Sequence, residues 1–495
     1  LMHATLQVLQ FAGILFLVFV VFSLLIIVHE LGHFLAGRWR GLKIDRFQVW
    51  FGKPIWKINR GGVQYGLGWV PFGGFVSLPQ MAPMEAIEGK SKDGSNSESL
   101  PPVSPLDKII VAFAGPLFSF LLAAFCALIV WFVGKPVADQ ATAREVGHVI
   151  AGSAAAEAGI LAGDEVLSVN GNEVERIHGM INSLEWFVIS SETPEIELKL
   201  RRNGSLLTQT LSVDVAELDT SAEERPWWSK TLGFIFERPP LPDVGILGRE
   251  YPRVGEVMPH SPAAEMGIEP GDLVVGINGD PILNRLQIGD VIAEQKPTEL
   301  QLTILRGDQR ETVTLRPRLP EKRPEGMDIP MLGMVWDEFG KGQLAYVNPF
   351  TQLAESATMM RSTLAAILNP ASEVGPTHLS SAVGIMRLYY RLFQHPDGWR
   401  LVLWFSVVLN VNLAIMNLLP IPLLDGGHIV MASLEWIRRR PLPMRSLKVV
   451  QTVAAVLLLG LMSILALKDF GDIAADTQAG VAIEFLPQDS KSSSG

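Results

Sequence analysis

The chain has 495 residues, so several structural units are expected rather than one core. Hydrophobic residues make up 48% and the mean hydropathy is positive, which is high for a soluble protein and points to membrane segments. The net charge of −10 argues against a nucleic-acid partner, because a phosphate-binding surface must be basic. The single cysteine, Cys126, excludes an intramolecular disulfide and a cysteine-based zinc site.

The first apolar segment, residues 7–36, is long enough to cross about 30 Å of hydrocarbon. It is too long for a signal-peptide core and no small-residue cleavage site follows it, so we expect a retained span. Inside it lies the sequence HELGH, with His29, Glu30 and His33. Ionisable groups within a membrane are costly and by default indicate a functional site.

Basic residues cluster after this span and none precedes it: Arg38, Arg40, Lys43, Arg46, Lys53, Lys57 and Arg60. The positive-inside rule therefore places this end in the cytoplasm. Further spans are expected at 108–133, 400–421 and 447–467, and a second basic cluster at 438–448 falls where the same orientation requires it. Both chain ends and residues 134–399 are then expected outside, in the periplasm of a Gram-negative cell.

Two stretches of the outer segment match each other at a constant offset of 108, VGHVIAGSAAAEAGILAGDEVLSVNG (146–171) and VGEVMPHSPAAEMGIEPGDLVVGING (254–279). They indicate a duplicated module. Each copy has a strand-like start, a short helix, a Gly-Asp turn, a β-branched strand and an Asn-Gly turn. Each is followed about 60 residues later by a Leu-Gly step between apolar residues, Leu232-Gly233 and Leu332-Gly333.

Residues 348–369 have apolar side chains at helical spacing, which fits an amphipathic helix on the membrane surface or a plain connecting helix. The third span then runs into NLLPIPLLDGGH (417–428). Pro420 and Pro422 remove helix N–H donors and should open the helix before Asp425, which is tolerable only around a cavity. Asn417 could hold a substrate backbone or bond to a neighbouring helix.

His29 and His33 are four residues apart, so on a helix they share one face and can bind one cation. Glu30 is displaced by about 100° around the helix, within reach of metal-bound water but poorly placed as a ligand. Asp425 reaches a similar depth and could complete the site, with His428 as a rival ligand. Imidazole and carboxylate donors favour zinc over calcium or magnesium. The alternative is a pair of buried histidines satisfied by hydrogen bonds.

HELGH, NLLPIPLLDGGH and two PDZ-like repeats between the second and third spans resemble the RseP-type site-2 protease family over most of the chain. The resemblance implies a polytopic α-helical membrane protein with four transmembrane helices, a membrane-embedded β-loop and two extracytoplasmic PDZ domains of β-sandwich-like, α+β structure. It implies one Zn²⁺ held by His29, His33 and Asp425, with Glu30 as general base. Substrate-holding roles are implied for Asn417, Pro420, Pro422, Gly73 and Gly74.

In PDZ domains of this kind the Leu-Gly loop offers backbone N–H groups to a peptide carboxylate. Leu232, Gly233, Leu332 and Gly333 are therefore candidate peptide-loop residues. The alternatives are two spacers without a ligand, or a steric gate.

In chain order we expect these regions: 1–37 first span with HExxH, 38–82 β-loop region, 83–106 cytoplasmic linker, 107–134 second span, 140–238 and 244–338 PDZ-like domains, 345–398 periplasmic amphipathic helix and linker, 399–428 third span with NxxPxPxxDG, 446–468 fourth span, and 469–495 C-terminal tail.

The resemblance predicts an intramembrane zinc endopeptidase of the bacterial inner membrane, with its active site near the cytoplasmic side. Its partners would be the lipid bilayer, peptide or protein ligands of the PDZ domains, and a pre-trimmed single-span substrate, such as an anti-sigma factor or a signal-peptide remnant, in regulated intramembrane proteolysis. One alternative is a PDZ receptor or scaffold with a structural zinc in a closed site that includes His428. Another is a metal transporter, against which stands the presence of only four spans.

Two positions depart from the usual family pattern. Ser119 stands where relatives commonly have Asn, and LSSAVGI (379–385) replaces a common Ser-Gly-Pro run. We expect both changes to affect packing and substrate fit and to leave the metal shell untouched.

Overall fold

A computed structural model describes most of the chain, in these ranges: 2–81, 103–137, 144–212, 241–323, 327–337, 344–370, 372, 374–440, 442–479 and 483–485. The chain forms two compact units. The helical unit comprises Leu1–Lys135, Tyr346–Ser362 and Leu379–Asp469. The repeat unit comprises Pro136–Ala345, Thr363–His378 and Phe470–Gly495.

Four helices among the described residues are long and apolar enough to cross a membrane, which confirms the predicted number of spans. They are α1 (Met2–Trp39), α3 (Pro105–Val133), α11 (Gly398–Asn417) and the central part of α13 (Met444–Ala479). Ser104 caps the start of α3, because its hydroxyl accepts a hydrogen bond from the Asp107 N–H, and Pro105 is the first residue of the helix.

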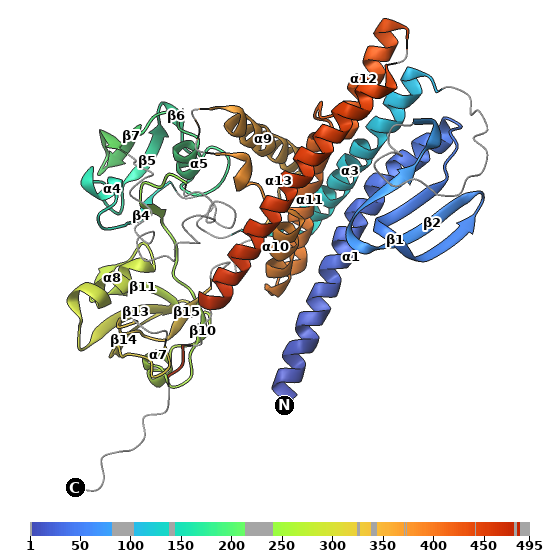
Figure 1. Ribbon diagram of the computed structural model, residues 1–495. Helices are drawn as coiled ribbons and strands as arrows, with labels where there is room; N and C mark the ends of the chain where they lie inside the picture. Colours follow the sequence, from blue (N-terminus) through green and yellow to red (C-terminus); the bar gives the residue numbers. More distant parts are fainter. Residues whose placement is uncertain are drawn as a thin grey trace, which may run out of the picture. The chain divides into compact units, whose positions relative to one another are not determined.

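α3 packs against α1, α11 and the shorter helix α12 (Asp425–Arg438), so it holds the elements of the site together (Figure 1). Gly32 of α1 lets the two helices approach closely. A Cβ at Gly32 would lie 2.3 Å from the Ala114 carbonyl oxygen, so any side chain there would force α1 and α3 apart.

The segment LSSAVGI, which departs from the family pattern, forms the start of a helix that the sequence did not predict, α10 (Ala382–Gln394). Ser381 caps this helix, and the Asp469 carboxylate accepts hydrogen bonds from the backbone N–H groups of Ser381 and Gly384. α10 packs against α1 and α11, with Tyr389 fully buried in that contact.

The predicted strands after the first span form one long antiparallel hairpin, β1 (Arg46–Arg60) and β2 (Val63–Ser77), followed by a 3-10 turn, η1 (Pro79–Met81). Gly61 and Gly62 both have positive φ, as a tight hairpin turn requires. The base of the hairpin is buried against α1, and residues 51–60 of β1 are exposed. Val63 and Tyr65, at the start of β2, are partly buried and pack against the same core. The register is irregular between Phe51 and Pro54, beside the cavity described below.

The third span ends at Asn417, and Asp425 begins a separate helix, α12, so the predicted unit 399–428 is not one helix. The prolines between them interrupt the backbone, as the sequence predicted. Gly426 and Gly427 let α12 start directly on this turn. Their Cβ atoms would lie 2.2 Å from the Leu418 carbonyl oxygen and 2.1 Å from that of Ile421.

The repeat unit contains two copies of one architecture. The first copy consists of β4 (Val146–Val149), α4 (Ala154–Glu157), β5 (Glu165–Val169), β6 (Asn172–Glu173), α5 (Leu184–Ile189), β7 (Glu195–Arg202), β8 (Ser205–Ser212) and β9 (Ile246–Gly248). The second consists of β10 (Val254–Val257), α7 (Pro262–Glu265), β11 (Leu273–Ile277), β12 (Asp280–Pro281), α8 (Leu286–Gln295), β13 (Leu300–Arg306), β14 (Gln309–Leu315) and β15 (Met334–Trp336). The sheet orders correspond: β6-β5-β7-β8 with β4-β9, and β12-β11-β13-β14 with β10-β15.

Connecting elements complete the described chain. They are the short pair β3 (Lys135–Pro136) and β16 (Leu344–Ala345), the helix α9 (Pro349–Leu368) and the 3-10 turn η5 (Pro376–His378). α9 lies where the amphipathic or connecting helix was expected.

The first copy extends beyond its predicted end at residue 238, because β9 pairs with β4. The Gly245 and Val244 carbonyls accept hydrogen bonds from the N–H groups of Ile150 and Ala155. In the second copy, Gly333 and Leu332 make the same two bonds to Met258 and Ala263. The counterpart of Leu332-Gly333 is therefore Val244-Gly245. The predicted counterpart, Leu232-Gly233, lies outside the described residues.

Candidate metal centre

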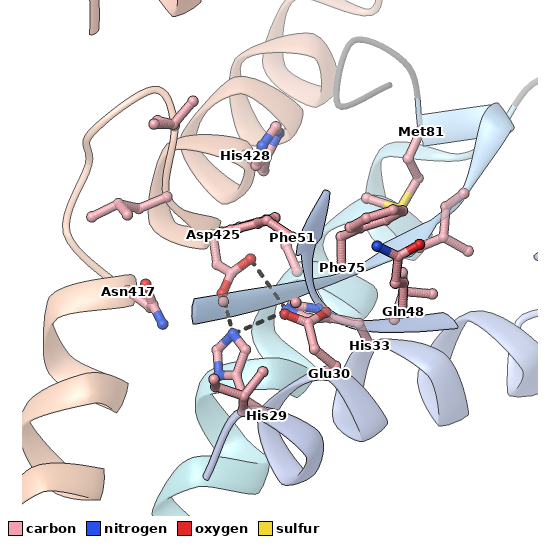
Figure 2. A pocket seen from close by; sticks show the side chains of 18 of the residues that line it. His29, Glu30, His33, Gln48, Phe51, Phe75, Met81, Asn417, Asp425 and His428 are labelled. Atoms are coloured by element: carbon pink, nitrogen blue, oxygen red, sulfur yellow. Dashed lines mark hydrogen bonds and ion pairs between the residues drawn. The ribbon is translucent and has the colours of Figure 1, made fainter. Parts of the chain in front are cut away.

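Three side chains from two helices converge at the predicted metal site (Figure 2). Helix α1 presents His29 and His33 on one face, one turn apart, and α12 presents Asp425 as its first residue. The two imidazole Nε2 atoms are 3.3 Å apart, and each lies 3.4 Å from one oxygen of the Asp425 carboxylate. All three residues are buried, each at most 9% exposed.

These separations fit a tetrahedral zinc ion. With zinc–ligand bonds of about 2.0–2.1 Å, two ligand atoms of a tetrahedron are about 3.3 Å apart. Two buried nitrogens and a carboxylate whose donor atoms face one another at this distance therefore need no rearrangement to bind one cation. The donor set of two imidazoles and one carboxylate leaves a fourth position for water or substrate, as catalytic zinc sites do.

The outer nitrogens of both imidazoles are held by α3. His33 Nδ1 donates to the Val111 carbonyl oxygen at 2.8 Å, so its Nε2 carries the free lone pair that faces the site. His29 Nδ1 lies 3.0 Å from the Ser119 hydroxyl. Ser119 is fully buried and contacts the ring of His29, a predicted metal ligand. The expectation that the departure at Ser119 leaves the metal shell untouched was therefore wrong.

The backbone of α3 forms one wall of the centre at Gly115. A Cβ at this position would lie 2.2 Å from His33 Nε2 and 2.9 Å from His29 Nε2. Only glycine allows the helix to approach the two nitrogens so closely. Sequence reasoning missed this residue, although a Gly-Pro pair inside an apolar span was a visible signal.

The donors open onto a cavity of about 940 Å³ in the helical unit. Its walls come from α1, the β1–β2 hairpin, α3, the end of α11, the turn before α12, α12 and α13. Glu30 lines this cavity beside the two histidines (Figure 2). It also borders the hairpin, because a Cβ at Gly74 would lie 3.2 Å from the Glu30 Cγ. Glu30 can therefore meet a substrate or water in the cavity without being a ligand.

The other predicted site residues divide between the cavity wall and the surface. Asn417, Pro422, Gly73 and Gly74 line the cavity, whereas Pro420 is exposed and does not. Gly73 has a φ of 64°, and a Cβ there would overlap the ring of Phe51, so this corner of the hairpin requires glycine.

His428 also lines the cavity, but the cluster of donor atoms found in the described chain contains only His29, His33 and Asp425. Figure 2 shows its ring on α12, away from the three converging side chains. The described geometry therefore gives no closed four-ligand site of the kind that a structural zinc would use.

Leu332 and Gly333 belong to the repeat unit. Leu332 is buried, and both carbonyls are engaged by the second copy itself, as described above.

The model of Peptidase family M50 matches residues 17–461 of the chain. The chain is 25% identical to the regulator of sigma-E protease RseP of Escherichia coli, over 91% of this chain and 97% of that protein. It is 27% identical to the protease RseP of Yersinia pestis, with 91% and 97% covered. It is 24% identical to a Vibrio cholerae protein with zinc metalloprotease in its name, with 92% and 98% covered.

Proposed function

We propose that this chain, which belongs to Peptidase family M50 and is a zinc metalloendopeptidase of the membrane, cleaves its substrate within a membrane-spanning segment. The observation that carries the proposal is the convergence of His29, His33 and Asp425, at zinc-ligand separations, at the end of an apolar span. The cavity of about 940 Å³ beside them has room for an extended peptide segment.

The roles of the site residues follow from their positions. His29, His33 and Asp425 would hold one zinc ion, while Val111 and Ser119 fix the two imidazole rings. Bound zinc supplies Lewis-acid polarisation of the scissile carbonyl and activation of the attacking water. Glu30 accepts the proton from that water and delivers it to the leaving amide nitrogen, since it lines the same cavity without being a ligand.

The substrate would lie between the hairpin and the end of α11. Gly73 and Gly74 of β2 line the cavity, so an extended peptide could pair with this strand. Asn417 offers an amide to the peptide backbone from the opposite wall, and Pro422 borders the same space. A substrate helix must first unwind, because its carbonyls are hydrogen-bonded, so helix-weakening residues near the cut are expected.

The natural substrate would be a single-span protein already trimmed outside the membrane. The relatives named regulators of sigma-E protease support an anti-sigma-factor-like substrate, and signal-peptide remnants are a second source of short spans. In this proposal the enzyme is a multi-pass protein of the bacterial inner membrane, with the two repeats as periplasmic PDZ domains that exclude bulky ectodomains. The basic residues after α1 and α12 support that orientation.

The test replaces the general base and keeps the ligands. Glu30→Gln should retain one zinc per chain and cleave a purified single-span substrate at least about 100-fold more slowly, because general-base catalysis is removed. Glu355→Gln, at an exposed position on α9, is the matched control and should keep wild-type activity. Undiminished cleavage by Glu30→Gln would refute its role, and wild-type protein without zinc would refute the metal centre.

A further inference from the structure

A short segment after α13 lies on the second repeat. Glu484 forms an antiparallel bridge with Lys322, in which the Lys322 N–H donates to the Glu484 carbonyl at 3.1 Å and the Glu484 N–H donates to the Lys322 carbonyl at 3.0 Å. The side chains of the same two residues form an ion pair at 3.0 Å. The segment therefore adds to the repeat as an extended strand does, through backbone bonds and one charge.

The next residue, Phe485, is inserted into the repeat and is only 4% exposed. Its ring lies 5.5 Å from the Arg318 guanidinium, at cation–π distance. On another side it contacts the Leu332-Gly333 loop, because a Cβ at Gly333 would lie 3.0 Å from the Phe485 ring. The ring thus occupies the place that a side chain on this loop would need.

The residues around Phe485 are fixed by their own contacts, so the site is preformed. Gly333 has a φ of 79°, and a Cβ there would also lie 2.1 Å from the Ser261 side chain. Arg318 is held by an ion pair with Glu265 at 3.0 Å and by a hydrogen bond to the His260 carbonyl. Fixed positive and apolar surfaces of this kind recognise an aromatic side chain at low entropic cost.

We propose that this surface of the second repeat, formed by Gly333, Arg318 and Lys322, is a peptide-binding site whose resident ligand is the chain's own Glu484–Phe485 segment. Its ligand class is an extended peptide with an acidic residue followed by an aromatic one. The proposal goes beyond the proteolytic function, since it holds whichever bond the enzyme cleaves.

Occupation by the chain itself makes the site autoinhibited. Because the segment belongs to the same chain as its site, it competes with free peptide at an effective concentration on the order of millimolar. A free peptide of the same kind must compete with the chain's own segment. It should therefore bind readily only when that segment is displaced or altered.

The first test is a cross-link in the full-length chain. Residues that exchange both N–H···O bonds across an antiparallel pair have Cα atoms about 5.5 Å apart, within the range of a disulfide. Lys322→Cys combined with Glu484→Cys should therefore form an intramolecular disulfide in most molecules on mild oxidation. The single variant Lys322→Cys should not, because the natural Cys126 is buried. Absence of the disulfide in the double variant would overturn the proposal.

The second test measures displacement. A fluorescein-labelled peptide with the sequence of residues 481–487 should bind wild-type protein weakly and the Phe485→Ala chain at least about tenfold more tightly. Phe350→Ala, at a highly exposed position on α9, should bind it as weakly as wild type. Adding Lys322→Glu to Phe485→Ala should abolish binding of this peptide and restore it for a peptide with Lys in place of Glu484. Equal binding by wild type and Phe485→Ala would overturn autoinhibition, and unchanged binding after Lys322→Glu would overturn the site.

Discussion

The metal centre and the two repeats are built from opposite kinds of contact. Within each repeat the defining ion pair joins residues of the same module, Asp164 with Arg202 and Asp272 with Arg306. The candidate metal centre instead joins α1, α3 and α12, and the hydrogen bond between His29 and Ser119 alone spans 90 positions. The repeats are therefore specified locally and twice, whereas the centre exists only when separate helices pack correctly. Substitutions in a repeat should therefore reduce the stability of that repeat, and substitutions at the centre should reduce zinc binding and cleavage.

The largest effect is expected at Gly115, where α3 meets the metal ligands. Gly115→Ala places a methyl group 2.2 Å from His33 Nε2, so the helix must move or the imidazole must turn away. We expect zinc content to fall to a small fraction of one per chain and cleavage to fall at least about 100-fold, because a misplaced ligand loses both binding and orientation. Metal analysis and cleavage of a single-span substrate measure the two losses.

Other span glycines provide the control for this experiment. Gly13 of α1 and Gly460 of α13 have open space where a Cβ would be, so Gly13→Ala and Gly460→Ala should keep zinc and activity. A full zinc complement in Gly115→Ala would contradict the claim that the centre depends on exact helix packing, because the centre would then tolerate a displaced helix.

A smaller effect is expected at Ser119. Ser119→Ala removes the partner of His29 Nδ1, and loss of such a partner lowers metal affinity or activity by about 10–100-fold. The matched control is Ser463→Ala on α13, whose hydroxyl is exposed and donates only to Leu459 of its own helix. Competition with a chelator gives the affinity, and equal zinc retention by the two variants would show that Ser119 does not support the ring.

The sequence predicts that His29 and His33 share one face, because helical geometry alone requires it, and the prolines predict the break before Asp425. The choice of Asp425 over His428 as the third candidate ligand comes from the family resemblance. The surroundings of these candidate ligands could not be predicted. The contacts of Gly115 and Ser119 depend on the rotation of α3 against α1, which no periodicity of an almost wholly apolar helix fixes.

The third prediction concerns stability within one repeat. The Asp272 carboxylate is 2% exposed and accepts hydrogen bonds from Arg306 and from the Glu269 N–H. Asp272→Asn should lower the free energy of opening of the second repeat by about 2 kcal/mol, the order expected when charged hydrogen bonds are lost. Hydrogen exchange should show faster exchange in β11 and β13, while β5 and β7 of the first repeat and the zinc content stay unchanged. Faster exchange in both repeats would mean that they do not open independently.

Acid should imitate this substitution. The hydrogen bond from Arg306 holds the pKa of Asp272 below its usual range. Because the folded pKa is lower than the unfolded value of about 3.9, the stabilisation is fully present above that value and is lost as the pH falls through the folded pKa. Wild-type protein should therefore lose protection in the second repeat on acidification, and Asp272→Asn should lose less. An identical acid response of the two proteins would remove Asp272 as the cause.

Part of the structure of the repeats could be predicted from their sequence, and part could not. The spacing between the copies, their turns and their shared sheet order are indicated by residues that occur twice. Examples are Asn170-Gly171 and Asn278-Gly279, and all four of these residues have positive φ. The loop that faces the short helix is not indicated in this way, because Val244-Gly245 takes that position in the first copy without a Leu-Gly step. The two loops share only the glycine. Their equivalence is established by backbone hydrogen bonds, which cannot be seen in the sequence.

The smallest effect is expected at Gly289, in the interior of α8. A Cβ at this position meets nothing within 4 Å, and its φ is not in the left-handed region. Gly289→Ala should therefore stabilise the second repeat by about 0.5–1 kcal/mol, because alanine loses less conformational entropy in a helix. Gly276→Ala on β11 is the opposite control, since its Cβ would crowd the Asp280 carbonyl at 3.0 Å and should destabilise the same repeat. Hydrogen exchange in the second repeat should be slower in Gly289→Ala and faster in Gly276→Ala than in the wild type. Because neither residue touches the helical unit's metal ligands, a change in zinc content in either variant would contradict the division between local stability and long-range chemistry.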